Sequence, residues 1–310
     1  MKSWQRLIIP VLFSTLVLCA SCLSNKSLRL SDHELFQLGS KQFNKKKFIK
    51  ARETFTLLID FYPDSQYSGE AQLLKADAFF REKNYIEAGV EYSLFLEFHP
   101  AHPKADYALY QEAECNYKHI KSIDRDQTNV LETIQKLKKL VSLYPASPFV
   151  PKAKERIAEC QNLFHLHSLY VARFYARWGE YRSSIHRYQN LSETKPPPSN
   201  ELAETIATEL SVVRSKFYQY LSTLADKYYE KGRYAQASFG YAEIVKYFPD
   251  DKQRDRVLFR LATSHFQLKD YDKAKDYYQQ LVDDFPQGEF YEKSVEKLQK
   301  IAEQSEEKLS

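Results

Sequence analysis

The chain of 310 residues carries 45 basic and 41 acidic side chains, which gives a formal net charge of +4 at pH 7. Because both signs are mixed along the chain and no long basic run is present, the composition argues against nucleic-acid binding. Only seven glycines occur, which favours helix and leaves no glycine-rich loop for a phosphate group.

The first element in chain order is a predicted signal peptide over residues 1–21. Lys2 and Arg6 give it a positive start, residues 7–18 are apolar, and two small residues precede Cys22. The apolar stretch is too short to span a bilayer as a stable helix. Residues 1–21 are therefore expected to be removed rather than to form part of the fold.

Cys22 lies in a setting that resembles the lipobox of bacterial lipoproteins, in which such a Cys becomes acylated and the peptide before it is removed. Lipid attachment at Cys22 is favoured over attachment at Cys19, which follows Leu18 rather than a small residue. Residues 22–31 are then a short tether from the acylated Cys. The alternative is an ordinary secretory signal that is cleaved near Ser21.

A pattern of residue types occurs four times, with a step of 37 residues within each of two pairs of copies. Its first copy consists of Leu38-Gly39, Phe48, Ala51, Phe55, Leu58 and Tyr62-Pro63, and the other copies begin at Lys75, Leu224 and Leu261. The small residue, the aromatic side chains and the Ala allow two antiparallel helices to pack closely, and the Pro ends the unit. The pattern resembles the tetratricopeptide (TPR) repeat, so the sequence predicts an all-α TPR helix-turn-helix solenoid.

The helical segments form six predicted repeats and a cap. Residues 32–195 hold repeats 1–4, and the third of these has an insertion that delays its second helix by eight residues. Residues 196–199 are a Pro-rich break in the helical pattern. Residues 200–289 hold a long helix with repeats 5–6, and residues 290–310 form an amphipathic C-terminal capping helix.

The polar residues show no constellation that supports catalysis. The sequence has no helical pair of His four residues apart with a Glu, no Gly-flanked Ser and no phosphate-binding loop. His165 and His167 are two residues apart, so on a helix their side chains diverge and cannot share a metal. We therefore expect neither an enzyme nor a bound cofactor or metal, and an envelope hydrolase is disfavoured because no nucleophile–base pair can be named.

Cys115 and Cys160 remain once Cys22 is acylated. Both fall on apolar faces of predicted helices, about one repeat apart. Two buried thiols are favoured over a periplasmic disulfide, which stays open as the alternative.

The first helices of successive TPR repeats line a groove, and exposed residues recur along them at three- and four-residue intervals. This spacing predicts a substrate groove that contains Phe36, Phe43, Asp77, Phe80, Arg81, Tyr107, Tyr110 and Tyr117. Aromatic side chains beside polar groups suit a peptide that is held by stacking and hydrogen bonds. The alternative for Phe36, Phe43 and Phe80 is a place in the core.

Three stretches in the first four repeats are more specific than the repeat pattern. They are His99-Pro100-Ala101-His102-Pro103 with Tyr107 and Tyr110, Tyr144-Pro145-Ala146-Ser147-Pro148-Phe149 with Arg156, and Val171-Ala172-Arg173-Phe174-Tyr175-Ala176-Arg177-Trp178-Gly179 with Arg187. The stretches resemble the BamD (ComL) family, the TPR lipoproteins of the bacterial outer-membrane β-barrel assembly machinery. The resemblance covers just over half of the chain and ends before the triple-Pro break, where family members usually continue to a fifth repeat.

The resemblance implies a protein on the periplasmic face of the bacterial outer membrane, anchored by its acylated Cys. Its implied partners are the POTRA domain of a BamA-like insertase, unfolded outer-membrane proteins and outer-membrane lipid. Arg187 matches an Arg of the family at the insertase contact, and Arg173 and Arg177 carry over as neighbours in partner binding. For Arg187 the alternative is an ion pair within the chain, with Glu180 or Glu193.

A second functional hypothesis stays open from the repeats alone. A TPR lipoprotein would equally suit another envelope process, as a secretion pilotin or as a coordinator of cell-wall synthesis with division. Assembly of outer-membrane β-barrels is favoured over these because the lipobox and the three family stretches occur in one chain.

Overall fold

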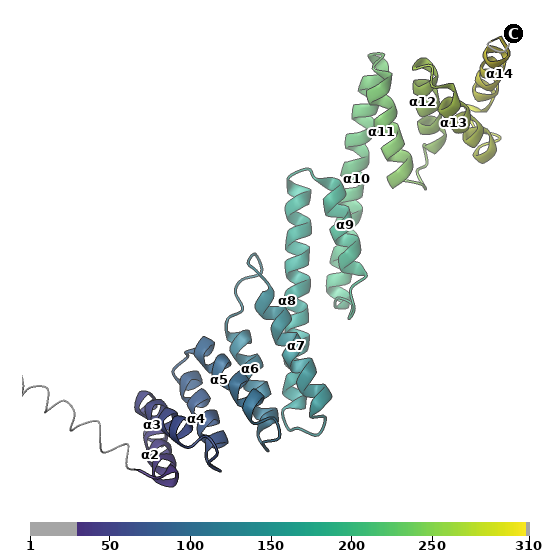
Figure 1. The fold of residues 1–310 in the computed structure, drawn as a ribbon. Helices are drawn as coiled ribbons and strands as arrows, with labels where there is room; N and C mark the ends of the chain where they lie inside the picture. The colour runs from purple at the N-terminus through teal and green to yellow at the C-terminus, as the bar shows by residue number, and fades with distance from the viewer. Residues whose placement is uncertain (1–29, 308–310) are drawn as a thin grey trace, which may run out of the picture. The chain divides into compact units, whose positions relative to one another are not determined.

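The computed structural model describes residues 30–307, which form thirteen α-helices and no strand (Figure 1). The chain divides into two compact units between His167 and Ser168, inside helix α8 (Val150–Arg177). The first unit also contains α2 (Asp32–Asn44), α3 (Phe48–Phe61), α4 (Ser68–Arg81), α5 (Tyr85–Phe98), α6 (Ala105–Lys118) and α7 (Thr128–Leu143). The second unit also contains α9 (Tyr181–Ser192), α10 (Asn200–Glu230), α11 (Tyr234–Tyr247), α12 (Arg254–Gln267), α13 (Tyr271–Asp284) and α14 (Tyr291–Glu307).

The predictions for the amino-terminal segment fall largely outside this range. The signal peptide over residues 1–21, lipid attachment at Cys22 and most of the tether precede residue 30 and lie outside the described residues. No helix between residues 30 and 307 combines the length and the apolar character that a membrane span requires.

Local sequence explains where the helices of a repeat begin and turn. Ser31 caps α2, because its hydroxyl accepts the Glu34 N–H while the Glu34 carboxylate accepts the Ser31 N–H at 2.9 Å. Five of the turns between the two helices of a repeat contain a residue with positive φ, and at two of them it is a glycine, namely Gly179 at 76° after α8 and Gly232 at 68° after α10. At three equivalent turns the residue in this conformation is a lysine, namely Lys46, Lys83 and Lys269.

Each repeat depends on a close approach between its two helices. Gly39 of α2 faces Phe55 of α3 so closely that a Cβ at residue 39 would lie 2.5 Å from the ring. Ala225 of α10 and Gly240 of α11 make a similar contact, since a Cβ on Gly240 would lie 2.8 Å from that of Ala225. Small residues at this contact leave room for the large second-helix side chains that are fully buried, namely Phe55, Tyr92, Tyr241 and Tyr278.

The observed helix pairs confirm the predicted all-α TPR fold, since successive helices pack against each other from α2 to α7 and from α9 to α14. The insertion in the third repeat shifts the register without breaking the repeat, because Thr133 takes the place that Ala51 has in the first repeat and is fully buried. A turn contact also returns after the insertion. Ser147 donates to Asp106 at 2.6 Å, as Ser65 donates to Asp32 at 2.7 Å in the first repeat.

Cys115 and Cys160 are both free and buried, so the favoured prediction of two buried thiols is the one observed. Burial raises the pKa of the Cys115 thiol to about 12 and that of the Cys160 thiol to about 11. A thiol that stays protonated near neutral pH is a poor nucleophile. Both side chains therefore act as small apolar residues of the core.

Gly39→Ala should lower the free energy of unfolding by about 1–3 kcal/mol, because the new methyl group overlaps the Phe55 ring. Gly89→Ala is the matched control, since a Cβ there meets only the Cys115 side chain at 3.5 Å and Ala favours helix over Gly. Urea unfolding followed by circular dichroism measures both variants. Equal unfolding midpoints would contradict the close-contact interpretation, and the double variant Gly39→Ala/Phe55→Leu should recover part of the lost stability.

Candidate functional site

The first unit contains an open groove along α4 and α6, which we name the α4–α6 groove. Its volume is about 490 Å³, and its lining residues are Glu70, Leu73, Leu74, Asp77, Pro103, Lys104, Asp106, Tyr107, Pro148 and Phe149. Apolar side chains thus lie beside carboxylates and an ammonium group. This mixture suits a peptide, which offers apolar side chains together with backbone hydrogen-bonding groups.

Stacked aromatic pairs occupy the corresponding place in the repeats on either side. Phe36 of α2 stacks on Tyr67 with ring centroids 5.0 Å apart and an interplanar angle of 19°. Tyr110 of α6 stacks on Phe149 at 5.1 Å and 20°, at the equivalent positions two repeats later. In both repeats the second ring covers the face of the first helix, which leaves less space for a ligand.

The repeat between them carries Leu73 and Lys104 at these positions. Leu73 is buried in the core of this repeat, and Lys104 pairs its ammonium group with Glu70 at 2.6 Å. No ring therefore covers α4 here. The groove opens at this repeat because the aromatic pair is replaced by an aliphatic residue and a long, polar one.

Asp77 is the polar centre of the α4–α6 groove. Its Oδ1 accepts a hydrogen bond from the Tyr107 hydroxyl at 2.8 Å and a second, short one from the Tyr92 hydroxyl. Both bonds end on Oδ1, so Oδ2 can still accept a donor of a bound chain. Burial raises the pKa of Asp77 above its ordinary value, and the two tyrosine hydrogen bonds partly oppose this effect. A ligand N–H placed at Oδ2 would stabilise the desolvated carboxylate.

Three of the predicted groove residues are half-buried and fill space between helices. Phe43 meets Phe48 edge-on with ring centroids 5.5 Å apart, and Phe80 meets Tyr85 edge-on at 5.2 Å. Phe36 packs against the core of the first repeat and also lines a separate open pocket of about 450 Å³ on α2. Phe36, Phe43 and Phe80 thus serve the packing of their repeats.

Two further predicted residues lie outside the lining of the α4–α6 groove. Arg81 is exposed in the last turn of α4. Tyr117 is covered by Arg156, whose guanidinium lies 3.7 Å from the ring centroid, and the Tyr117 hydroxyl donates to Glu159 at 3.3 Å. The structure therefore brings together Asp77 and Tyr107, with Tyr110 joined through its stacked partner.

Lys104 and Phe149 line the groove although the sequence did not predict them there. They occupy the position of Tyr67 in the next two repeats, once the eight inserted residues are counted. Spacing along the first helices cannot find them, because both residues lie outside the helices, directly before α6 and α8. The turns of successive repeats can be aligned with a step of 37 residues, with the eight inserted residues left out, and this alignment would have found Lys104 and Phe149.

A second candidate surface lies where α8 ends and α9 begins, and it belongs to the second unit. We name it the Trp178 patch, and it consists of Phe174, Tyr175, Arg177, Trp178 and Arg187. Trp178 is 74% exposed and Phe174 is 41% exposed, with ring centroids 6.0 Å apart. The Arg187 guanidinium lies 4.7 Å above the Tyr175 ring, and Arg177 is exposed. Exposed aromatic side chains beside arginines are typical of protein interfaces.

The two arginines predicted to flank this surface differ in their partners. Arg173 forms three hydrogen bonds with Glu209, at 3.2, 2.9 and 2.6 Å, which lower the pKa of the Glu209 carboxyl. Arg187 is exposed, and within the described residues neither Glu180 nor Glu193 forms an ion pair with it. Arg187 can therefore meet a carboxylate of a partner directly, whereas Arg173 would first have to leave Glu209.

His167 places Nδ1 2.5 Å from the Ile123 carbonyl oxygen, as a hydrogen-bond donor would. Between residues 30 and 307, no group of three His, Cys, Asp or Glu side chains lies close enough together to hold a metal ion.

Two parts of the chain match known protein families. The model of the family YfiO, described as outer membrane lipoprotein, matches residues 29–196, which is more than half of the chain. A tetratricopeptide repeat model matches residues 256–288. The first match runs from α2 to the end of α9, so it contains both the α4–α6 groove and the Trp178 patch.

Curated proteins named outer membrane protein assembly factor BamD are similar to this chain. The protein of Vibrio cholerae is 28% identical over 159 residues, which cover 48% of this chain and 66% of that protein. The protein of Neisseria meningitidis serogroup B is 25% identical over 171 residues, which cover 52% of this chain and 64% of that protein. The chain thus spans slightly less than two thirds of the length of these relatives.

Solved TPR structures show a weak similarity over most of the chain. The TPR domain of P58(IPK) has a TM-score of 0.36 and 13% identity, and the match covers 88% of this chain and 66% of that one. The TPR2AB domain of yeast Sti1 has a TM-score of 0.35 and 12% identity, covering 87% of this chain and 98% of that one. Scores this low add no argument, and the fold rests on the helix pairs themselves.

Asp77→Asn should raise the urea midpoint of unfolding at neutral pH. Because the folded pKa of Asp77 lies above its unfolded value, the folded chain binds this proton more tightly, and the group costs stability as the pH rises above about 4. Asn keeps an oxygen for the two tyrosine hydroxyls and removes the desolvated charge. The gain should shrink as the pH is lowered toward the ordinary pKa of an aspartate.

Asp60→Asn is the control, since Asp60 is exposed on α3 and its charge is already solvated. Unfolding of the three proteins is followed by circular dichroism across the acidic and neutral range. An Asp77→Asn variant that is less stable than the parent at neutral pH would show that the carboxylate stabilises the fold, contrary to this argument.

Proposed function

The chain belongs to the YfiO family of outer membrane lipoproteins, and on this basis we propose that it is a lipid-anchored periplasmic scaffold of the β-barrel assembly machinery. In this role it binds a BamA-like insertase and unfolded outer-membrane proteins. It supports the folding of these outer-membrane proteins and their insertion into the outer membrane. The observation that carries the proposal is the family match over residues 29–196, which contains both candidate surfaces. The role is one of binding rather than catalysis.

The α4–α6 groove supports the substrate part of the proposal. Strands of outer-membrane barrels alternate apolar and polar residues and are rich in aromatic side chains at the membrane interfaces. Leu74, Pro103 and Phe149 offer apolar contacts to such side chains, and Asp77 offers an acceptor for a backbone N–H. An extended, unfolded segment can make the apolar contacts and the hydrogen bond to Asp77 at the same time, because its side chains alternate between two faces.

The Trp178 patch supports the insertase part of the proposal. Trp178 can bury a large apolar area on association, and Arg187 offers five N–H donors in a fixed plane to a carboxylate or carbonyl group. We assign the POTRA domain of the BamA-like insertase to this surface. Arg177 is an exposed neighbour that adds positive charge, and Arg173 contributes by orienting Glu209.

The proposal is tested by affinity purification of the tagged protein from detergent-solubilised envelopes of its own cells. Recovery of a BamA-like barrel protein with POTRA domains supports it. Recovery only of secretion-channel proteins or of cell-wall synthesis proteins would overturn it and favour the other envelope processes. Washing at high salt distinguishes a specific complex from attraction between surface charges.

Trp178→Ala and Arg187→Ala should each weaken binding to the purified POTRA domains by about 1–3 kcal/mol, as truncated interface residues do. Both side chains are exposed, so the melting temperature of the free protein should change little. Tyr220→Ala is the control, because Tyr220 is 55% exposed in the same unit but lies outside the patch. Titration calorimetry gives the affinities. Unchanged affinity in both patch variants would remove the insertase contact from this surface.

Cys22→Ala should release the protein from the membrane into the soluble periplasmic fraction, since it removes the proposed acylation site. Cys19→Ala is the matched control, because Leu18 precedes Cys19 and the change should leave the protein with the membrane. Fractionation after a high-salt wash, followed by immunoblotting, measures both. Membrane residence of the Cys22→Ala protein would place the anchor elsewhere.

A further inference from the structure

The second unit repeats the helix pairs of the first unit with a different charge on the first helices. Two positions on the first helix of a repeat lie six and two residues before its small residue. In the first unit these positions hold Glu70 and Leu74 on α4, and Tyr107 and Gln111 on α6. Counted from the small residue of its repeat, the same positions on α12 carry Arg256 and Arg260, and one step of 37 residues further along the chain α14 carries Lys293 and Lys297. We name these four residues the cationic face.

The two arginines of the cationic face share a single carboxylate. Arg256 Nη2 lies 2.9 Å from Asp226 Oδ2, and Arg260 pairs with Asp226 Oδ1 at short range. Asp226 also accepts a hydrogen bond from the Tyr241 hydroxyl at 2.6 Å. Two guanidinium groups therefore meet one carboxylate, and the pair of arginines keeps a net positive charge.

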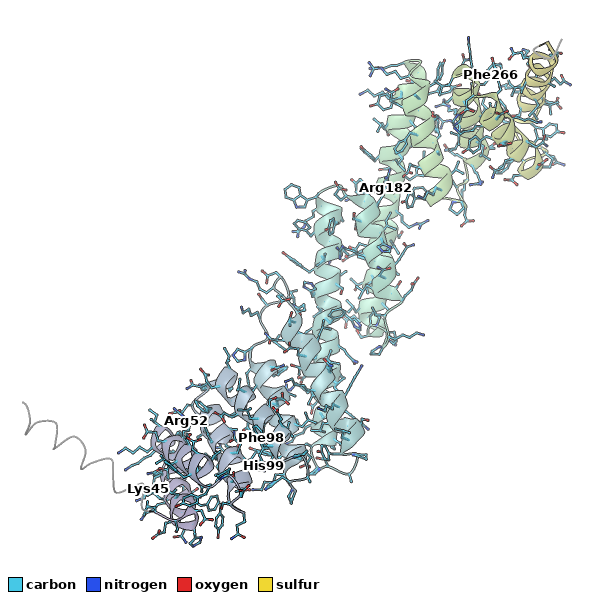
Figure 2. The ribbon with its side chains drawn as sticks, in the orientation of Figure 1. Lys45, Arg52, Phe98, His99, Arg182 and Phe266 are labelled. Carbon is cyan, nitrogen blue, oxygen red and sulfur yellow. The ribbon has the colours of Figure 1, made fainter. Side chains whose placement is uncertain are left out.

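The two lysines of the cationic face lie over aromatic rings. Lys297 Nζ lies 4.8 Å from the centroid of Phe266 on α12, which is labelled in Figure 2, and Lys293 Nζ lies 5.5 Å from that of Phe290. No carboxylate pairs with either lysine in the part of the chain that the structure describes, where Glu296 of the same helix pairs with Lys300 instead. Both ammonium groups are thus available to an anion.

A small opening adjoins the arginines. In the first unit the stacked pair Phe36–Tyr67 covers the first helix, and Phe259 and Phe290 stack in the same way at 4.8 Å in the last repeat. The repeat of α10 and α11 has Ser222 and Gln253 at these positions. A cavity of about 70 Å³ opens there, with Ser222, Gln253, Arg256 and Arg260 among its lining residues. The absent aromatic pair thus leaves the arginines accessible.

We propose that the cationic face binds an acidic peptide segment of a partner protein. Carboxylates of the segment pair with the ammonium groups of Lys293 and Lys297. They also pair with the free N–H donors of Arg256 and Arg260, whose planar guanidinium groups suit carboxylates. The rings of Phe266 and Phe290 give apolar side chains of the segment a surface beside these charges. The surface lies beyond residue 196, where the family match ends, so the inference does not depend on the proposed function.

A peptide is favoured over a nucleic acid as the occupant. A nucleic acid places a phosphate at every nucleotide, and its backbone would have to pass Asp226 and the neighbouring Asp251, which accepts a hydrogen bond from Tyr218 at 2.7 Å. An acidic peptide can vary its sequence and place uncharged residues opposite these two carboxylates. The cavity of about 70 Å³ is also small for a base, whereas a carboxylate group enters it more easily.

The test uses the full chain and a fluorescein-labelled peptide of Asp and Glu residues with one central Phe, followed by fluorescence anisotropy. The chain should bind this peptide, and binding should weaken as salt is raised. Lys293→Glu/Lys297→Glu should weaken binding by about tenfold or more. Lys231→Glu/Lys275→Glu is the matched control, because it makes the same change of net charge at exposed lysines of the same unit outside the cationic face, and its affinity should stay within about twofold.

Three outcomes would overturn the proposal. The parent chain fails to bind the acidic peptide, or binds it no better than the same peptide with Asn and Gln in place of Asp and Glu. The two double variants lose the same affinity, which would show attraction to net charge alone. A labelled oligothymidylate binds more tightly than the peptide, which would assign the cationic face to nucleic acid. Melting followed by circular dichroism verifies that both variants are folded.

Discussion

Close approach between the two helices of a repeat is the constraint on which the rest of this structure depends. A small residue on the first helix, such as Gly39 or Ala225, lets the second helix come near enough to bury its aromatic side chain completely. No single helix can hide its apolar stripe alone, so each pair must also pack against the next. This contact fixes which side of the first helix faces the second helix and which side faces away. It therefore also determines which residues of the first helix are exposed.

The candidate grooves arise where a second, weaker rule of the repeat is broken. A ring that precedes the next first helix stacks on a ring of the first helix in three repeats, as Phe36–Tyr67, Tyr110–Phe149 and Phe259–Phe290. The α4–α6 groove and the small opening beside the arginines both occur where this pair is absent. The core contact is unaffected by the loss, since Tyr92 and Tyr241 stay buried in those repeats. Binding surface is thus gained at positions that the core does not need.

The sequence predicted the helices well because their signals are local. Helix α10, for example, begins at Asn200, directly after its Ser199 cap. The site residues were harder to predict, because a ring at groove spacing, such as Phe80, also suits the gap between two helices. Pairing of Arg173 with Glu209 links helices whose relative placement no local pattern gives. The roles of the site residues in binding stay predictions.

The residue that follows the small position shows how one scaffold carries different chemistry. Asp77 and Asp226 both accept a hydrogen bond from the hydroxyl of a buried tyrosine fifteen residues later, and the hydroxyls of Thr263 and Tyr278 share a hydrogen bond in which either can donate. In the first repeat the aromatic residue is Phe55, which has no hydroxyl, and the Ser40 hydroxyl is left without a partner within the described residues. The neighbouring first helix then decides the local charge. It adds the Tyr107 hydroxyl to Asp77, whose pKa stays above its ordinary value because burial outweighs this hydrogen bond, and it adds two arginines to Asp226, which leaves a positive surface. Because these additions come from a helix outside the pair, the ligand preference of a repeat can change without disturbing the contact that folds it.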